Sequence, residues 1–153
     1  MPQPAIGAVL FVCAGNICRS PMGAAILARR LGTRPFPPTI ESAGVAALVD
    51  QPADPLACSL LEEKGMNLSA HRARQLTPNL ASAFDLILVM DERQQRAVEK
   101  IFPPARGRAH RLGRFGDFDI PDPYRKPRAA FAASLALIER GVDDFVRAFW
   151  TSK

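Results

Sequence analysis

The sequence predicts an α/β fold, a three-layer sandwich in which a central parallel sheet of four strands lies between helices on both faces. Two short, continuous apolar runs, at 8–12 (AVLFV) and 86–90 (LILVM), are typical of strands buried on both faces. Stretches with helical periodicity lie between such runs, and several open on a capping residue followed by proline. Because strands and helices alternate, we expect a parallel sheet with right-handed crossovers.

The first unit is a strand over 8–12, then a loop and a helix. We expect the helix to open at Ser20-Pro21, with Ser20 as N-cap and Pro21 at the first helical position. Gly32 follows its last apolar residue and is predicted to be its C-terminal glycine. A second strand is predicted over 39–42.

The middle of the chain carries two more helix starts of the same kind. Asp54-Pro55 predicts a helix that Gly65 closes, and Thr77-Pro78 predicts a shorter one. These helices precede the strand at 86–90.

The last part of the chain supplies the remaining elements. After the strand at 86–90 we expect a helix over 92–101 and a short fourth strand near 109–112. A long helix over 128–150 is the most regular, because its apolar residues recur at steps of three or four. Its predicted inward stripe is Phe131, Leu135, Ile138, Val142, Phe145, Val146 and Phe149.

Length and charge limit the classes of function. A chain of 153 residues fits one domain, residues 1–153, with one core. The formal charge of +5 favours anionic ligands, but it is spread out, and aromatic residues do not interleave with the basic ones. We therefore expect no nucleic-acid partner.

Compartment is predicted from three features. No segment approaches the roughly 20 apolar residues that span a bilayer, so no membrane association is expected. The N-terminal apolar run has no Lys or Arg before it, which argues against a secretory signal. Cysteines at positions 13, 18 and 58 are odd in number, which favours a reducing compartment. These features predict a cytoplasmic protein.

The loop from Cys13 to Ser20, CAGNICRS, leaves a buried strand and enters a helix. Its small residues let the backbone curl so that successive N–H groups point inward, and the helix N-terminus adds unsatisfied donors. This arrangement makes a socket for a tetrahedral oxyanion. The predicted phosphate-binding residues are Ala14, Gly15, Asn16, Ile17, Cys18 and Ser20.

Three side chains of this loop predict chemistry. A thiolate is favoured in such a positive field, which places Cys13 for in-line attack on phosphorus. Arg19 can grip two phosphate oxygens through its planar fork. Ser20 can also donate a hydrogen bond to the Cys13 sulfur. The alternative is a cysteine that simply fills the core at a strand end, but its place at a strand-to-helix switch favours the catalytic interpretation.

These motifs resemble the low-molecular-weight protein tyrosine phosphatases. The stretch 9–27 (VLFVCAGNICRSPMGAAIL) resembles their phosphate-binding loop, and 41–44 (ESAG), 71–76 (HRARQL), 88–91 (LVMD) and 120–124 (IPDPY) follow in the family's order. The resemblance therefore covers nearly the whole chain. It implies the family's phosphotyrosine phosphatase I-like fold.

Two further stretches are more similar to the bacterial branch linked to tyrosine kinases of exopolysaccharide export. They are 47–49 (ALV) with 53–55 (ADP), and 122–126 (DPYRK). The substrate implied is a tyrosine-phosphorylated protein, such as a bacterial tyrosine autokinase or another protein of that pathway. We expect a monomer or a weak dimer.

By this resemblance Cys13 is the nucleophile, Arg19 binds phosphate, and Asp122 is the general acid that later acts as base. From the residues alone, Asp122 would be a turn aspartate before proline. Asn16, Ser42 and His71 match positions of a hydrogen-bonded network behind the loop.

The resemblance also suggests the pocket and a redox partner. Tyr124 and Leu48 are expected to line the substrate pocket, together with residues 115–118. Cys18 can form a reversible disulfide with the nucleophile, or it is only a small residue that fits the loop. Cys58 is expected to be packing.

Two other functions stay open at this point. An arsenate reductase would use the same socket but needs further cysteines, and 81–90 contains none. A phosphocarrier would keep its phosphate and would not need Arg19 together with a general acid. No cofactor or metal is expected, because His71 and His110 have no ligand-like spacing with the cysteines.

Overall fold

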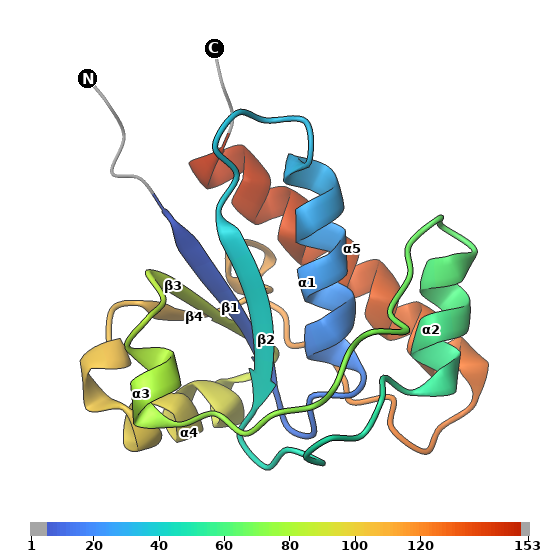
Figure 1. Ribbon diagram of the computed structural model, residues 1–153, viewed down its shortest axis with the longest axis horizontal. Helices are drawn as coiled ribbons and strands as arrows, with labels where there is room; N and C mark the ends of the chain where they lie inside the picture. The colour runs from blue at the N-terminus through green and yellow to red at the C-terminus, as the bar shows by residue number, and fades with distance from the viewer. Residues whose placement is uncertain (1–5, 151–153) are drawn as a thin grey trace.

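The computed structural model describes residues 6–150, and these build a four-stranded parallel sheet (Figure 1). The strands are β1 (Ala8–Cys13), β2 (Thr39–Gly44), β3 (Leu86–Val89) and β4 (Ala109–Arg111), in the spatial order β2-β1-β3-β4. All three pairings are parallel, as predicted. The two central strands are buried along nearly their whole length, which explains their unbroken apolar sequences.

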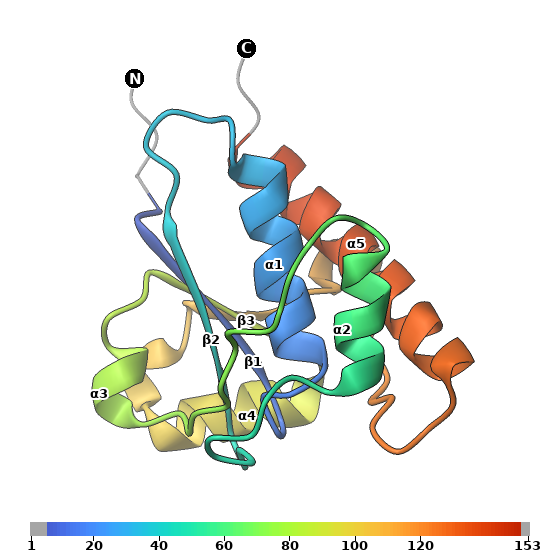
Figure 2. The ribbon, with the colours of Figure 1, turned by 45° about the vertical axis from the view of Figure 1, so that its right-hand side comes forward.

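Helices cover both faces of the sheet (Figures 1 and 2). On one face lie α1 (Arg19–Leu31), α2 (Pro55–Glu62) and α5 (Arg128–Phe149). On the other lie α3 (Pro78–Ala81) and α4 (Glu92–Ile101). Two short 3₁₀ turns, Pro103–Ala105 and Arg114–Gly116, lie between α4 and α5 along the chain. The predicted three-layer sandwich is therefore confirmed.

Strand β1 connects the two halves of the core. Val9, Phe11 and Cys13 face α1, α2 and α5, while Leu10 and Val12 face the side of α4. Helix α1 lies so close to β1 that a Cβ on Gly23 would stand 2.6 Å from the Phe11 ring. This contact holds the start of α1 over the carboxyl end of β1.

The start of α1 differs from the prediction. The helix begins at Arg19, Cys18 occupies the N-cap without a side-chain cap bond, and Ser20 lies inside the first turn. Ser20 is therefore not the N-cap, because its hydroxyl is engaged by other side chains, as described below. Gly32 also differs, since it keeps right-handed helical geometry with φ −61° instead of a left-handed turn.

The other predicted helix signals are confirmed. Asp54 accepts from the backbone N–H of Leu56 at 2.9 Å, and Thr77 accepts from that of Leu80 at 3.1 Å. Gly65, just beyond α2, has φ +81°, which favours glycine.

The inward stripe of α5 is confirmed for most of its residues and wrong at its end. Phe131, Leu135, Ile138, Val142 and Phe145 are buried, whereas Val146 is half-buried and Phe149 is exposed. Phe149 instead stacks on Phe145 with ring centroids 5.7 Å apart. None of the helices between residues 6 and 150 is long and apolar enough to cross a membrane.

Candidate active site

The loop between β1 and α1 turns its carbonyl groups outward. Each one accepts a hydrogen bond from the surrounding chain, at distances between 2.6 and 3.2 Å. In the order Cys13, Ala14, Gly15, Asn16, Ile17 and Cys18, the donors are the backbone N–H groups of Val45, Ala46 and Leu48, the His71 side chain, and the backbone N–H groups of Asp54 and Met22.

The amides of the same loop have no hydrogen-bond partner in the described part of the chain. Within residues 6–150, none of the N–H groups of 14–18 donates to another part of the chain. Since carbonyl and amide point in opposite directions in a tight curl, outward carbonyls leave inward donors, an anion-binding nest. Asn16 takes φ 60° in this curl, and asparagine tolerates that left-handed geometry.

Strand β2 supports the curl from outside. A Cβ on Gly44 would lie only 2.4 Å from the Ala14 carbonyl oxygen and 3.1 Å from the Asn16 N. Glycine at position 44 is therefore required for the loop to pack against the end of β2.

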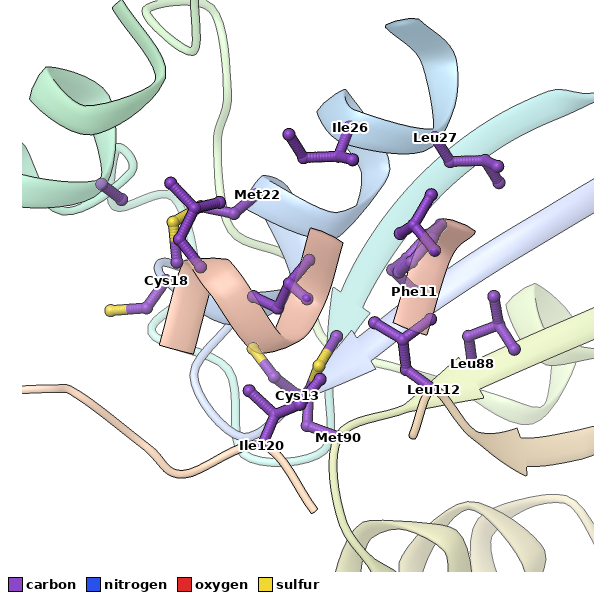
Figure 3. Packing of buried hydrophobic residues seen from close by; sticks show 14 of the residues in the cluster. Phe11, Cys13, Cys18, Met22, Ile26, Leu27, Leu88, Met90, Leu112 and Ile120 are labelled. Atoms are coloured by element: carbon purple, nitrogen blue, oxygen red, sulfur yellow. The ribbon is translucent and has the colours of Figure 1, made fainter. Parts of the chain in front are cut away.

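Cys13 lies beneath this loop, at the end of β1. It is buried beside Met90 and Ile120 (Figure 3), and its Sγ lies 2.9 Å from the Ser20 Oγ. Ser20 already accepts a hydrogen bond from the Asn16 side chain at 2.7 Å. The Ser20 hydroxyl hydrogen is therefore free to point at the sulfur, where it stabilises a thiolate.

The side chain of Asn16 has every hydrogen-bonding group paired. Its Nδ2 donates to Ser20 and, at 3.0 Å, to the Ser42 Oγ, while its Oδ1 accepts from the backbone N–H of Arg74 at 2.9 Å. This pairing fixes the orientation of the amide. The structure thus brings Asn16, Ser42 and His71 together behind the loop.

His71 fixes the loop from the same side. Its Nε2 lies 2.6 Å from the Asn16 carbonyl oxygen and must donate, because a carbonyl oxygen only accepts. Burial lowers the pKa of His71, and the guanidiniums of Arg72 and Arg74 lower it further, while the bond to Asn16 acts in the opposite direction. A neutral imidazole with its proton on Nε2 therefore holds the loop.

Arg19 is only 3% exposed. Its Nη1 donates to the Ile120 carbonyl at 2.8 Å, and carboxylate oxygens of Asp91 and Asp122 each lie 3.6 Å from the guanidinium. These groups offset the cost of burying the charge. Its Nε is buried with no hydrogen-bond partner among the described residues, so a donor is left for a ligand.

Asp122 lies at the rim, with its side chain 50% exposed. Its Oδ1 accepts from the backbone N–H of Tyr124 at 3.1 Å. The segment before it is fixed by Ile120, whose N–H donates to the Met90 carbonyl, and by Pro121, whose carbonyl accepts from Ser134. A carboxyl group open to water is thereby held beside Arg19.

These groups surround one cavity of about 190 Å³, called here the Cys13 cavity. Leu48 and Tyr124, the two residues expected at the substrate pocket, line it, and both are partly exposed. Its lining is Cys13, Ala14, Gly15, Ile17, Cys18, Arg19, Ala46, Leu48, Asp122 and Tyr124.

The expectation that residues 115–118 wall this cavity is wrong. None of them lines it. Phe115 packs instead against Phe145, with ring centroids 5.0 Å apart, and the Arg140 guanidinium lies over the Phe118 ring. Helix α5 holds this segment away from the cavity.

The other two thiols differ from Cys13 in place. Cys18 is buried and lines the Cys13 cavity, and burial raises its pKa well above the ordinary range. Asp54 and Cys13 raise it further, and Arg19 opposes them. Cys18 is therefore a protonated thiol. Cys58, half-buried on α2, packs against the core, and burial also raises its pKa.

The structure adds site residues whose roles the sequence did not reveal. Asp91 contacts Arg19 and also caps α4, accepting from the N–H of Gln94 at 2.9 Å. Arg74 contacts Asn16 through its backbone and donates to the Ser42 carbonyl through Nε. Asp91 could have been found from its position just after a buried strand, at the edge where the loop lies. Arg74 has no such positional signal and is marked only by its place in the 71–76 motif.

Within the described residues, no three His, Cys, Asp or Glu side chains are grouped to hold a metal ion. The groups present are a buried thiol, inward amides, a buried guanidinium and a rim carboxyl. On an α/β sandwich this combination is typical of phosphatases that use a cysteine nucleophile.

Comparison with known proteins identifies the family. The profile described as "Low molecular weight phosphotyrosine protein phosphatase" matches residues 8–152, so the chain belongs to this family. The resemblance found in the sequence is confirmed, and the chain is a low-molecular-weight protein-tyrosine-phosphatase.

Individual relatives agree. EpsP of Ralstonia nicotianae, named "Probable low molecular weight protein-tyrosine-phosphatase", is 46% identical, and the match covers 92% of this chain and 94% of EpsP. Wzb of Escherichia coli K12, a low molecular weight protein-tyrosine-phosphatase, is 42% identical over 92% of this chain and 93% of Wzb. The structure of Vibrio vulnificus Wzb in complex with benzylphosphonate superposes with a TM-score of 0.88 at 37% identity, covering 94% of this chain and 99% of that one.

Proposed function

We propose that this phosphatase hydrolyses phosphotyrosine in proteins through a phosphocysteine formed on Cys13. The observation that carries the proposal is the loop 13–18. Within residues 6–150, each of its carbonyls accepts a hydrogen bond and none of the N–H groups of 14–18 donates one, above the buried thiol of Cys13. Arg19 adds its buried Nε, a donor that has no partner among residues 6–150. Inward amides and a buried guanidinium donor fit a tetrahedral anion.

In the first step the Cys13 thiolate attacks phosphorus. A sulfur–phosphorus bond forms and the bond from phosphorus to the tyrosine oxygen breaks, so the electron pair leaves with the phenolate. Asp122 gives its proton to that oxygen. The loop amides and Arg19 stabilise the charge on the equatorial oxygens of the transferring group.

In the second step water attacks the phosphocysteine. Asp122, now a carboxylate, takes a proton from that water, and the sulfur–phosphorus bond breaks to release inorganic phosphate. The Ser20 hydroxyl, 2.9 Å from Sγ, stabilises the thiolate as it leaves. Asp122 is suited to this step because its half-exposed side chain meets both cavity and water.

The cavity walls favour an aromatic phosphate ester. Ile17, Leu48 and Tyr124 give apolar surface above the phosphate socket, on which a tyrosine ring can pack. The benzylphosphonate in the Vibrio vulnificus Wzb complex joins a benzyl group to a phosphonate, which is the same combination of shapes. Serine and threonine phosphates would leave these walls uncovered.

For the protein substrate we propose a bacterial tyrosine autokinase or another protein of exopolysaccharide production, as the resemblance to that branch implies. The cytoplasm is the compartment we propose, since all three cysteines are free and the nucleophile has to stay reduced.

The test compares three reactions. Phosphate release is measured from a phosphotyrosine peptide and from its phosphoserine analogue, and thiol-dependent arsenate reduction is measured beside them. We expect turnover on the phosphotyrosine peptide alone. A Cys13→Ser variant should lose turnover and still bind inorganic phosphate. If Cys13→Ser keeps activity close to that of the parent, Cys13 is not the nucleophile. If arsenate is reduced faster than the phosphotyrosine peptide is hydrolysed, phosphotyrosine is not the substrate.

A further inference from the structure

A second hollow adjoins the Cys13 cavity. It has a volume of about 680 Å³ and is formed by residues 47–55, apart from Asp50, together with Ile17 and Tyr124. We call it the flanking groove. Nothing in the two catalytic steps uses it.

The flanking groove is continuous with the Cys13 cavity. Ile17, Leu48 and Tyr124 line both. A tyrosine ring that stands in the cavity leaves its main chain at the mouth, so residues on one side of it in the same peptide can lie over the groove. About 3.3–3.6 Å of extended chain per residue puts the nearest neighbours within its reach.

The surface of the groove is apolar and exposed. Six large hydrophobic side chains are exposed within residues 6–150, and three of them, Leu48, Val49 and Tyr124, line this groove. Val49 is the most open of the three, at 54% exposed. An apolar cluster beside a reactive site gains free energy when an apolar group covers it.

The segment that forms the groove is held in place before any ligand binds. Asp50 and Ala73 are joined by a short ladder, in which the Asp50 N–H donates to the Ala73 carbonyl at 2.8 Å and the Ala73 N–H donates to the Gln51 carbonyl at 2.9 Å. The N–H of Ala47 donates to the Gln75 side chain at 2.9 Å. A ligand therefore does not have to order this segment.

The charge in the groove also favours an apolar side chain over an acidic one. Among the described residues that line the groove, Asp54 is the only charged one, and one of its carboxylate oxygens already caps α2. The Arg125 guanidinium does not line the groove and lies over the Tyr124 ring, 5.3 Å from its centroid. An acidic side chain placed beside Asp54 would meet this carboxylate over an apolar floor, which is unfavourable. An apolar side chain meets no such penalty.

We propose that the flanking groove binds an apolar side chain next to the phosphotyrosine of the protein substrate, and so determines which phosphotyrosines are dephosphorylated fastest. The inference rests on the proposed function, because it needs the phosphotyrosine in the Cys13 cavity. Its occupant is a leucine-like or isoleucine-like residue close to the phosphotyrosine along the peptide.

The test uses phosphotyrosine peptides that differ at one position. Leu, Gly or Asp is placed in turn at each of about three positions on either side of the phosphotyrosine, which an extended chain spreads over about 10 Å in each direction. We expect Leu at one position to raise kcat/KM about tenfold over Asp, the size of effect that a hydrophobic pocket gives.

Variants assign this preference to the groove. Val49→Asp should abolish the preference for Leu while leaving turnover of p-nitrophenyl phosphate, which has no flanking residues, unchanged. Phe36→Asp makes the same change of charge at an exposed hydrophobic residue that lines neither hollow, and should keep the preference.

The outcomes separate the two proposals. If the peptides are hydrolysed at equal rates whatever residues flank the phosphotyrosine, the groove proposal is overturned and the proposed function is left intact. A preference for Leu that survives in Val49→Asp would also overturn the groove proposal. If none of the phosphotyrosine peptides is hydrolysed, both the groove proposal and the proposed function are overturned.

Discussion

The guanidinium of Arg19 donates a hydrogen bond to the carbonyl of Ile120 at 2.8 Å, across 101 positions of the chain. Ile120 opens the segment that carries Asp122, and the Asp122 carboxylate lies 3.6 Å from the same guanidinium. One side chain of the phosphate-binding loop thus positions the segment that holds the proton donor.

Arg19→Lys should lower kcat on the order of 10²–10³-fold, the usual cost of losing an electrostatic donor to the transition state. Lysine carries its three N–H donors on one nitrogen, so it cannot donate to the Ile120 carbonyl and also match two phosphate oxygens with the spacing of a planar guanidinium. The measurement is kcat and phosphate affinity on the same preparation. Arg93→Lys, a like change at an exposed position by the neighbouring hollow, is the control. Equal activity of Arg19→Lys and parent would contradict the role of Arg19 in binding two phosphate oxygens.

Asp122→Ala should lower kcat by about 10²–10⁴, the range for loss of a general acid. The loss should be greatest for aryl phosphates whose phenols are weak acids, because their phenolates most need a proton. The rate is therefore measured over a series of leaving groups. The same fractional loss for every leaving group would argue against proton donation.

The elements of the sheet could be predicted closely, because buried parallel strands such as 86–90 are apolar on both faces. Helix N-caps could also be predicted where no other group binds the capping side chain, as at Asp54 and Thr77. The cap predicted at Ser20 was wrong, since Cys13 and Asn16 engage its hydroxyl.

The tertiary parts of the site were less predictable. The requirement for glycine at 44 arises from the register of β2 against the Ala14 carbonyl, which sequence spacing does not contain. The prediction that residues 115–118 line the cavity failed because tertiary packing on α5, which sequence spacing does not contain either, decides where that aromatic segment lies.

Cys18→Ser should leave turnover nearly unchanged and make inactivation by peroxide harder to reverse. Peroxide oxidises the Cys13 thiolate to a sulfenic acid; the Cys18 thiol then displaces water and closes a disulfide that added thiol can reduce. Activity is measured after peroxide and again after thiol. Cys58→Ser, at a cysteine that does not line the cavity, is the matched control. If Cys18→Ser recovers as fully as the parent, Cys18 has no protective role.

His71 makes stability depend on pH in a definite direction. Burial lowers its pKa below the value of about 6.5 that it has in an unfolded chain. The unfolded state then binds more protons than the folded state as pH falls below about 6.5, so stability is full above this value and is lost as the pH drops toward the folded-state pKa. Protonated His71 would also face Arg72 and Arg74, which adds to the loss.

His71→Gln should remove this part of the pH dependence, because glutamine can donate to the Asn16 carbonyl without titrating. The free energy of unfolding in urea is measured for parent and variant between about pH 7.5 and pH 5.5, above the range where carboxyl groups titrate. We expect the parent to lose more stability than the variant over this interval. His110, whose pKa burial also lowers, titrates in both proteins and cancels in the comparison. Parallel curves for parent and variant would show that His71 is not held neutral beneath the loop.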